Sequence, residues 1–323
     1  MQVEGTAAGL LGMEVDLPRL AKRVGLDEVT LVVHVEPVVD GMVLEVGDEH
    51  GDIDGCHAVQ TARKGCLSAR LPVVRVVSEA SIPDLLDEVA GLVAASLGRV
   101  EDWGLSGARP GQYHSDVAAD AIAVERLTGA GVGVVSEESG PHHPDRDIVV
   151  VVDPLDGSTN AAHGVQWYAT SLCAIDRDGP LAAVVVDLAH DRWYRARRGG
   201  GATRDGQPVR PAAVTAVDEA LVGLSGLPPR HLGWRQYRAL GASALDLCAV
   251  ADGTLDGFVD CSIDAHGPWD YLGALLVCHE AGAVMTDALD RPLVALDHAA
   301  RRTPVAGCTQ ALHDALRAAR AGF

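Results

Sequence analysis

The sequence is poor in basic residues. It carries 26 Lys and Arg against 45 Asp and Glu in 323 residues, which gives a formal net charge of -19. Proteins hold nucleic-acid phosphates mainly with Lys and Arg, so this balance argues against a nucleic-acid partner. Solubility alone is a sufficient reason for the acidic excess.

Long apolar runs are also missing. No stretch approaches the roughly 18 consecutive apolar residues that a membrane-spanning helix needs. The N-terminus lacks the basic and then apolar layout of a signal peptide. We therefore expect a cytoplasmic protein without a membrane partner.

Paired cysteine motifs are absent. The seven cysteines are odd in number, and no two are spaced as CxxC, so neither a disulfide framework nor a zinc knuckle is indicated. We interpret them as small core residues. The apolar fraction of 48% and the charged fraction of 22% are typical of a globular chain.

Residues 1–79 differ from the rest and form an extension of unknown role, which we interpret as a small β-rich segment. Two apolar runs within 29–46 surround Asp40-Gly41, a pair that favours a hairpin turn. The acidic stretch 48–55 lacks the spacing of a calcium loop and is interpreted as a solvated turn. Residues 73–77 form a further candidate strand.

Residues 80–323 begin with two predicted helices. Ser81 is a good N-cap, and apolar residues recur at helical spacing as far as Leu97. Ser115 is the predicted cap of a second helix, in which Asp116 and Asp120 share one face. An exposed acidic face explains these two aspartates as well as a functional role does.

The most informative stretch is 149–160, VVVVDPLDGSTN. Its valines predict a buried strand, which Pro154 and Gly157 are expected to stop. Ser158, Thr159 and Asn160 then offer a helix start. This places Asp153 and Asp156 at the end of a strand, beside backbone amides that can face an anion.

The remaining pattern alternates strands and helices, which predicts an α/β protein. The predicted strands are 131–135, 169–175, 181–188, 192–196, 257–260 and 304–307, with a turn at 205–206, and the predicted helices are 242–250, 269–281 and one capped by Thr309.

Four carboxylates share a placement at the ends of these elements: Glu137, Asp153, Asp156 and Asp270. Open α/β layers gather ligands at strand ends, so we expect these side chains to converge. A set made only of carboxylates selects magnesium, manganese or calcium rather than zinc. Carboxylates that hold such a cation, beside free backbone amides that hold an anion, are what a metal-assisted phosphate site needs.

Three runs carry a family resemblance: SEES at 136–139, DPLDGSTN at 153–160 and WDYLGALLVCHEAG at 269–282. They resemble the signatures of the inositol monophosphatase family of magnesium-dependent, lithium-sensitive phosphatases. The likeness covers about residue 81 to the end. It implies alternating helix and sheet layers over 80–323, with lobes of about 80–210 and 211–323, and a homodimer.

The resemblance also implies a set of metal ligands. Glu137, Asp153 and the carbonyl of Leu155 would hold one Mg2+, while Asp153, Asp156 and Asp270 would hold a second, with Asp153 as the bridge. Two or more Mg2+ ions are expected, and Mn2+ is an alternative.

Further roles follow from the same resemblance. The amides of Gly157 and Ser158 would receive the phosphate, while Ser158 and Asp120 would orient and deprotonate the attacking water. Glu137 counts with these two as catalytic. The residues that would line the substrate are Asp156, Gly157, Ser158, Ser243, Asp260 and Asp270. The sequence departs from the family in having no Thr just before Asp120, and its loop from Asp260 to Asp270 is longer.

The predicted function is Mg2+-dependent hydrolysis of a small sugar or polyol phosphate, inositol-1-phosphate first. Fructose-1,6-bisphosphatase, 3',5'-bisphosphate nucleotidase and histidinol-phosphate phosphatase share the phosphate chemistry and stay open. An inactive regulatory, metal-binding homologue is the alternative outside enzymes, and the complete carboxylate set argues against it.

Overall fold

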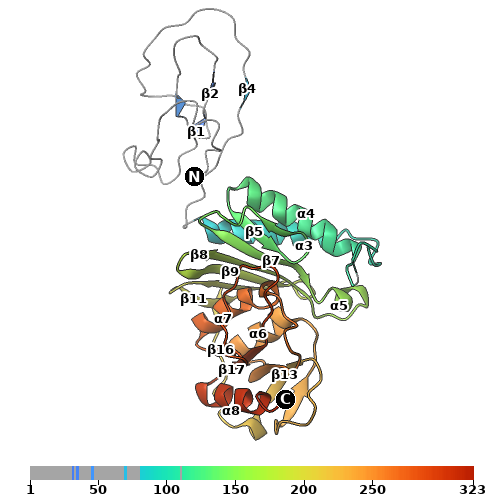
Figure 1. Ribbon diagram of the computed structural model, residues 1–323, viewed down its shortest axis with the longest axis vertical. Helices are drawn as coiled ribbons and strands as arrows, with labels where there is room; N and C mark the ends of the chain where they lie inside the picture. The colour runs from blue at the N-terminus through green and yellow to red at the C-terminus, as the bar shows by residue number, and fades with distance from the viewer. Residues whose placement is uncertain (1–30, 33, 36–44, 47–68, 71–80, 110) are drawn as a thin grey trace, which may run out of the picture. The chain divides into compact units, whose positions relative to one another are not determined.

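The computed structural model describes residues 31–32, 34–35, 45–46, 69–70, 81–109 and 111–323. The chain divides into two compact units, Met1–Ser81 with Gly129–Gly131, and Ile82–Thr128 with Val132–Phe323. Figure 1 shows their helices and strands, with labels on many of them.

Among the described residues of the first unit, four short strands form two antiparallel pairs: β1 (Leu31–Val32) with β3 (Glu45–Val46), and β2 (His34–Val35) with β4 (Ala69–Arg70). The antiparallel pairing of β1 with β3 agrees with two runs that fold back on each other. The predicted turn at Asp40-Gly41, the acidic turn at 48–55 and the strand at 73–77 lie outside the described residues.

The second unit contains a large sheet with the strand order β12-β11-β10-β9-β8-β7-β5-β6. Its strands are β5 (Gly133–Ser136), β6 (Gly140–His142), β7 (Val149–Asp156), β8 (Ala169–Asp176), β9 (Gly179–Asp187), β10 (Arg192–Arg197), β11 (Gly201–Arg204) and β12 (Gln207–Pro208). Only the β5–β7 pair of this sheet is parallel. The turn predicted at 205–206 is confirmed between β11 and β12.

A smaller sheet of the same unit has the order β14-β13-β15-β17-β16. Its strands are β13 (Leu221–Ser225), β14 (Gln236–Arg238), β15 (Gly257–Asp260), β16 (Val284–Asp287) and β17 (Pro304–Gly307). The predictions for β15 and β17 are confirmed, while β13, β14 and β16 were missed. The expected lobe boundary near residue 210 falls between the two sheets, and the domain division itself stays a prediction.

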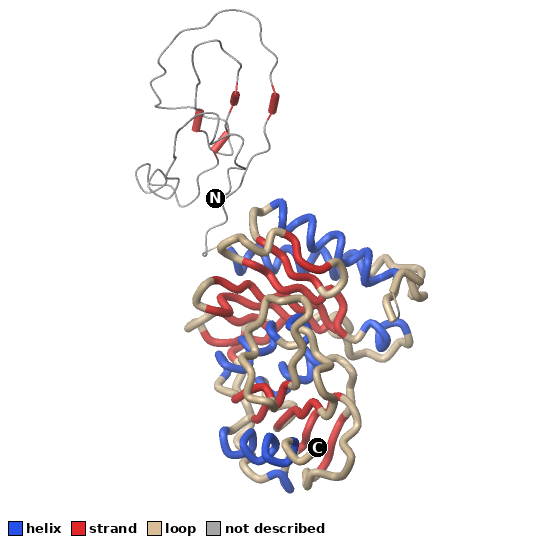
Figure 2. The backbone as a smooth tube through the Cα atoms, in the orientation of Figure 1, coloured by secondary structure: helices blue, strands red, loops and turns tan. Residues whose placement is uncertain are grey.

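Helices alternate with these sheets as layers. They are α3 (Ile82–Leu97), α4 (His114–Gly129), α5 (Ser158–Ala162), α6 (Ser243–Ala251), α7 (Leu272–Ala281) and α8 (Gln310–Arg320), with the short 3-10 helices η1 (Val217–Glu219) and η2 (Pro268–Asp270). Figures 1 and 2 show α3 and α4 on one face of the large sheet, α6 and α7 between the sheets, and α8 beyond the small sheet. The predicted layered α/β fold is confirmed.

The central helices explain how the two sheets stay together. Every residue of α6 after Ser243 is buried, and so is every residue of α7 from Leu272 to Cys278. Helices that are apolar on all sides are stable only when they are covered on all sides, and these two meet a sheet on each face. None of the described helices combines the length and apolar character that crossing a membrane requires.

Strand β7 does not stop at Pro154 as predicted but continues to Asp156. Asp153 pairs with Ser171 and Asp156 with Ala169, so Pro154 and Leu155 stand opposite the single residue Thr170. This is a β-bulge, where a proline is tolerated because the extra residue needs no ladder hydrogen bond.

Two helix starts also differ from the prediction. Helix α4 begins at His114, so Ser115 lies inside it and is not its cap. Asp116 and Asp120 are 4% and 6% exposed, which makes the interpretation as an exposed acidic face wrong. The helix predicted over 269–281 is divided into η2 and α7, although it ends at Gly282 as expected, with a φ of 97°.

Candidate metal centre

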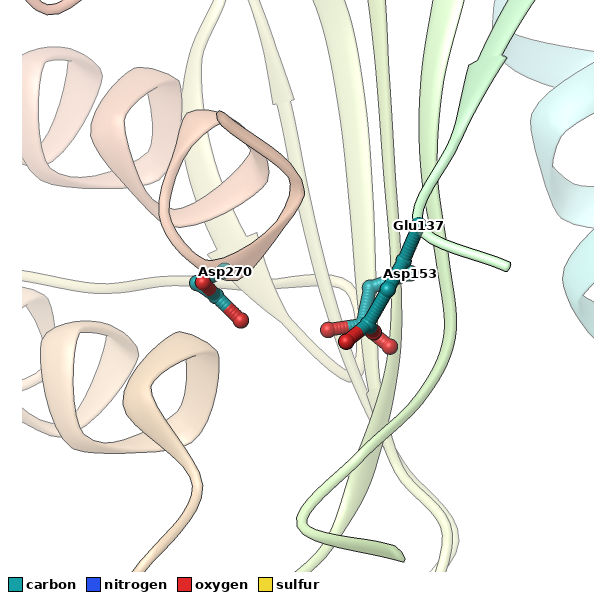
Figure 3. Close-up of side chains that lie close together, drawn as sticks. All are labelled: Glu137, Asp153 and Asp270. Atoms are coloured by element: carbon teal, nitrogen blue, oxygen red, sulfur yellow. The ribbon is translucent and has the colours of Figure 1, made fainter. Parts of the chain in front are cut away.

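Three of the four predicted carboxylates converge. Glu137, Asp153 and Asp270 each offer an oxygen, and these oxygens lie within 4.8 Å of one another. In Figure 3, Glu137 and Asp153 lie side by side, and Asp270 points toward them from a different part of the chain.

The secondary structure brings this triplet together. Strands β5 and β7 are parallel neighbours in which Ser136 is level with Val152, so the next residue on each strand, Glu137 and Asp153, are adjacent. The Glu137 amide donates to the Val152 carbonyl over 3.0 Å and extends the ladder by one step. Asp270 ends η2, where its Oδ2 accepts the Gly267 amide at 2.6 Å.

One carboxylate oxygen of Asp153 is buried without a hydrogen-bond donor or a cation among the described residues. The side chain is 1% exposed, and its Oδ1 accepts the Leu155 amide at 3.0 Å. Its Oδ2 is buried without a hydrogen-bond donor from any described residue. Burial of an ionised carboxylate oxygen without a partner is costly, so such an atom calls for a proton or a cation.

The charge balance of the cluster supports the same conclusion. Burial raises the pKa of Asp153 well above its usual value, and the charges of Glu137, Asp156 and Asp270 raise it further. Burial, followed by the charge of Asp270, also raises the pKa of Glu137. Carboxylates this close cannot all ionise without a counter-charge. The residues therefore fit a hard, oxygen-binding cation.

Asp156 stands at the edge of this triplet. Its Oδ2 accepts the amide of Ala244, in the first turn of α6, at 2.7 Å. Burial and then the charge of Asp270 raise the pKa of Asp156. One oxygen of Asp156 thus holds the first turn of α6. Its charge also raises the pKa of Glu137 and Asp153 in the triplet.

The turn after Asp156 depends on glycine. Gly157 has a φ of 80°, which side chains rarely tolerate, and a Cβ there would approach the Ala242 Cβ to 3.0 Å and the Trp167 carbonyl oxygen to 3.1 Å. Gly157 itself precedes α5, which begins at Ser158 and so confirms the predicted helix start, although no side chain caps this helix. The side-chain Nδ2 of Asn160 donates to the backbone carbonyls of Trp167 and Leu240.

Asp120 meets a residue that the sequence analysis did not assign. The hydroxyl of Ser136 donates to Asp120 Oδ1 and accepts the Glu138 amide at 3.1 Å. Ser136 directly precedes Glu137, so it links α4 to the acidic cluster. Its position as the first residue of the SEES run was the available signal.

Ser243 and Asp260 are joined through a second unassigned residue, His266. Ser243 Oγ lies 2.7 Å from His266 Nε2, and His266 Nδ1 lies 2.9 Å from Asp260 Oδ2. Burial lowers the pKa of His266, but the hydrogen bond to Asp260 and nearby carboxylates raise it more, and the net change is upward. Asp260 is fully buried, so the expected direct contact between Asp260 and a substrate is not what this arrangement offers.

The fold and the site together define a class: a layered α/β protein with an acidic, cation-binding centre at strand ends. Comparison with known proteins identifies the family. The model of the inositol monophosphatase family matches residues 115–321. The chain belongs to the inositol monophosphatase family, which consists of metal-dependent phosphatases, and it is a phosphoric monoester hydrolase.

Two relatives carry enzyme names. An inositol-1-monophosphatase of Mesorhizobium japonicum is 34% identical over 218 residues, 60% of this chain and 79% of that protein. A fructose-1,6-bisphosphatase/inositol-1-monophosphatase of Thermococcus kodakarensis is 36% identical over 180 residues, 54% of this chain and 69% of that protein.

One further relative has a name that is not that of an enzyme, and one solved structure shares the layered α/β fold. The Nus factor SuhB of Salmonella typhimurium is 30% identical over 190 residues, 53% of this chain and 70% of that protein. The structure of inositol monophosphatase from Anabaena has a TM-score of 0.62 and 25% identity, and the match covers 74% of this chain and 95% of that one.

Proposed function

We propose that the chain is a Mg2+-dependent phosphatase of small sugar or polyol phosphates and that inositol-1-phosphate is its preferred substrate. The observation that carries the proposal is the buried Asp153 Oδ2, which has no donor among the described residues and lies in a triplet of carboxylates. The name of the Mesorhizobium relative supports this choice of substrate.

The proposed ligands are those that the resemblance to the family implies, and the convergence of Glu137, Asp153 and Asp270 supports them. Glu137, Asp153 and the Leu155 carbonyl would hold one Mg2+, and Asp153, Asp156 and Asp270 would hold the other. The bulge after Asp153 supports a role for Leu155, because it takes this residue out of the regular strand pairing. When bound, such cations make water more acidic and stabilise the charge on the phosphoryl group and on the leaving oxygen.

Side chains and backbone amides of the protein would accept the proton, orient the water and bind the phosphate. Asp120, held by the Ser136 hydroxyl, would accept a proton from the attacking water, and Ser158 would help orient that water. The amides of Gly157 and Ser158 would bind phosphate oxygens.

No covalent nucleophile is needed for this hydrolysis. Burial raises the pKa of the Cys173 thiol to about 12. This side chain is therefore a neutral core thiol at neutral pH and not a reactive thiolate.

Fructose-1,6-bisphosphate is the second candidate substrate, favoured by the double name of the Thermococcus relative. A screen of phosphate release decides between them. It compares inositol-1-phosphate, fructose-1,6-bisphosphate, adenosine 3',5'-bisphosphate and histidinol phosphate, each with Mg2+ and with a chelator. We expect Mg2+-dependent release, fastest from inositol-1-phosphate. Purified Asp153→Asn protein is the background control. Equal rates with the chelator, or no release from any compound, would refute the proposal.

A further inference from the structure

Ser243, His266 and Asp260 form a continuous hydrogen-bonded chain across three elements. Ser243 begins α6, Asp260 ends β15, and His266 lies in the loop that leads to η2. The two contacts of the ring measure 2.7 Å to Ser243 and 2.9 Å to Asp260. The histidine and the aspartate are buried, whereas Ser243 is partly exposed. The open end of this chain is therefore the serine hydroxyl.

Hydrogen bonds hold both carboxylate oxygens and the backbone carbonyl of Asp260. Asp260 Oδ1 accepts the Ser262 amide at 2.8 Å, and Oδ2 faces the histidine. The Asp260 carbonyl accepts the guanidinium of the buried Arg320 at 2.6 Å. Both carboxylate oxygens are thus engaged, and Asp260 can influence a substrate only through His266.

The serine end adjoins the phosphate site. Ser243 directly precedes Ala244, whose amide holds Asp156, and His266 directly precedes Gly267, whose amide holds Asp270. The Ser243–His266 bond therefore ties together the two segments that support these carboxylates.

The ring determines what Ser243 can bind. A carboxylate only accepts hydrogen bonds, so the ring nitrogen that faces Asp260 carries a proton. The other nitrogen either accepts the serine proton, which leaves a lone pair of Ser243 free, or donates to Ser243, which leaves its O–H free. A hydroxyl group satisfies both states because it donates and accepts.

From this geometry we propose that His266 is a positioning residue that presents the Ser243 hydroxyl to a second hydroxyl of the substrate, next to the esterified one. The proposal rests on the proposed phosphatase function and deepens it. The favoured leaving group is a polyol with neighbouring hydroxyls, and a simple alcohol or phenol lacks the required partner.

The test uses two substrates, inositol-1-phosphate and 4-nitrophenyl phosphate, which has no second hydroxyl. His266→Asn keeps a donor toward Asp260 but no longer reaches Ser243, and Ser243→Ala removes the hydroxyl alone. Each should reduce kcat/KM for inositol-1-phosphate about tenfold more than for 4-nitrophenyl phosphate, mainly through KM. The double variant should lose no more than either single one, since both remove the same contact.

His313→Asn is the matched control. His313 is also buried between a hydroxyl and a carboxylate, with Thr286 Oγ1 at 2.9 Å and Asp314 Oδ1 at 3.0 Å, but it lies on α8. This variant should leave the ratio between the two substrates unchanged. Equal losses on both substrates in folded Ser243→Ala protein would overturn the role of His266. Wild-type protein that hydrolyses neither substrate would instead overturn the phosphatase proposal, and this inference with it.

Discussion

The two sides of the site solve the problem of a buried carboxylate in opposite ways. Asp260, on the side proposed for the alcohol, has a protein donor on each oxygen. Asp153, on the side proposed for the phosphate, is equally buried but lacks a donor on Oδ2 among the described residues. A satisfied carboxylate organises its neighbours, whereas an unsatisfied one is kept for something that the chain does not supply. The presence or absence of protein donors therefore distinguishes structural carboxylates such as Asp260 from the proposed metal ligand Asp153.

The strongest test of this difference is Asp153→Asn. The substitution keeps the shape but removes the charge that the cations need, and cation stabilisation is worth several kcal/mol. We expect phosphate release to fall by about a thousandfold or more. Without metal, the variant should melt at or above the wild-type temperature, because an unpaired buried charge has gone. It should also lose the rise in Tm that Mg2+ gives to the wild-type protein.

Asp287 offers a matched control for this test. It is as buried as Asp153, but it accepts hydrogen bonds from the Arg291 guanidinium and from the Thr303 amide. Asp287→Asn should destabilise the protein by about 2 kcal/mol in thermal unfolding, because it weakens the charged hydrogen bonds from Arg291, which keeps only its more exposed partner Asp264, while Mg2+ still raises its Tm. If the two variants behaved alike, the distinction between scaffold and metal site would fail.

The phosphate side was the more predictable from sequence. Glu137 and Asp153 end or interrupt strands with clear apolar patterns, and parallel neighbours place such residues side by side. Even there, the bulge at Pro154 was missed, because the next strand decides whether an irregular residue can be accommodated. A buried run of valines predicts a strand but not its pairing register.

The alcohol side was harder to predict because long-range contacts build it. Asp260 and His266 are six residues apart, and their meeting with Ser243 depends on how α6 packs against β15. Strand β14 was missed since its three residues are all exposed, so it has no alternating apolar pattern. A lone histidine in a Gly- and Pro-containing loop carries no signal until its neighbours in space are known.

Asp246 does not fit either of these two groups of carboxylates. It is buried and lies outside the metal triplet, but its hydrogen bond does not offset the cost of burying its charge. Its Oδ1 accepts the Trp167 indole at 2.9 Å. Burial outweighs this bond and the charge of His266, and raises the pKa of Asp246 from 3.8 to about 7. Folding therefore favours its protonated form, so its contribution to stability is complete below pH 4 and is lost as the pH rises toward 7.

The corresponding test is the pH dependence of unfolding in Asp246→Asn. The neutral variant keeps a carbonyl for Trp167 and has nothing to ionise. Between pH 4 and pH 7, the free energy of unfolding of the wild-type protein should fall relative to the variant by up to about 4 kcal/mol. Denaturant titrations at several pH values measure this difference. A difference that stayed constant over that range would mean that Asp246 ionises without cost in the folded protein.

The smallest expected effect concerns Asp120, a carboxylate of the phosphate side that does have a protein donor. Ser136→Ala removes that donor, the hydroxyl that holds Asp120 Oδ1, and leaves the metal ligands in place. We expect kcat for inositol-1-phosphate to fall about tenfold with little change in KM, because a hydrogen bond that orients a proton acceptor contributes about 1.5 kcal/mol. Ser136→Thr should recover most of the rate. Ser139→Ala, in an exposed position three residues along the same run, should not alter kcat. An unchanged kcat in Ser136→Ala would show that the hydrogen bond from Ser136 is not needed to orient Asp120.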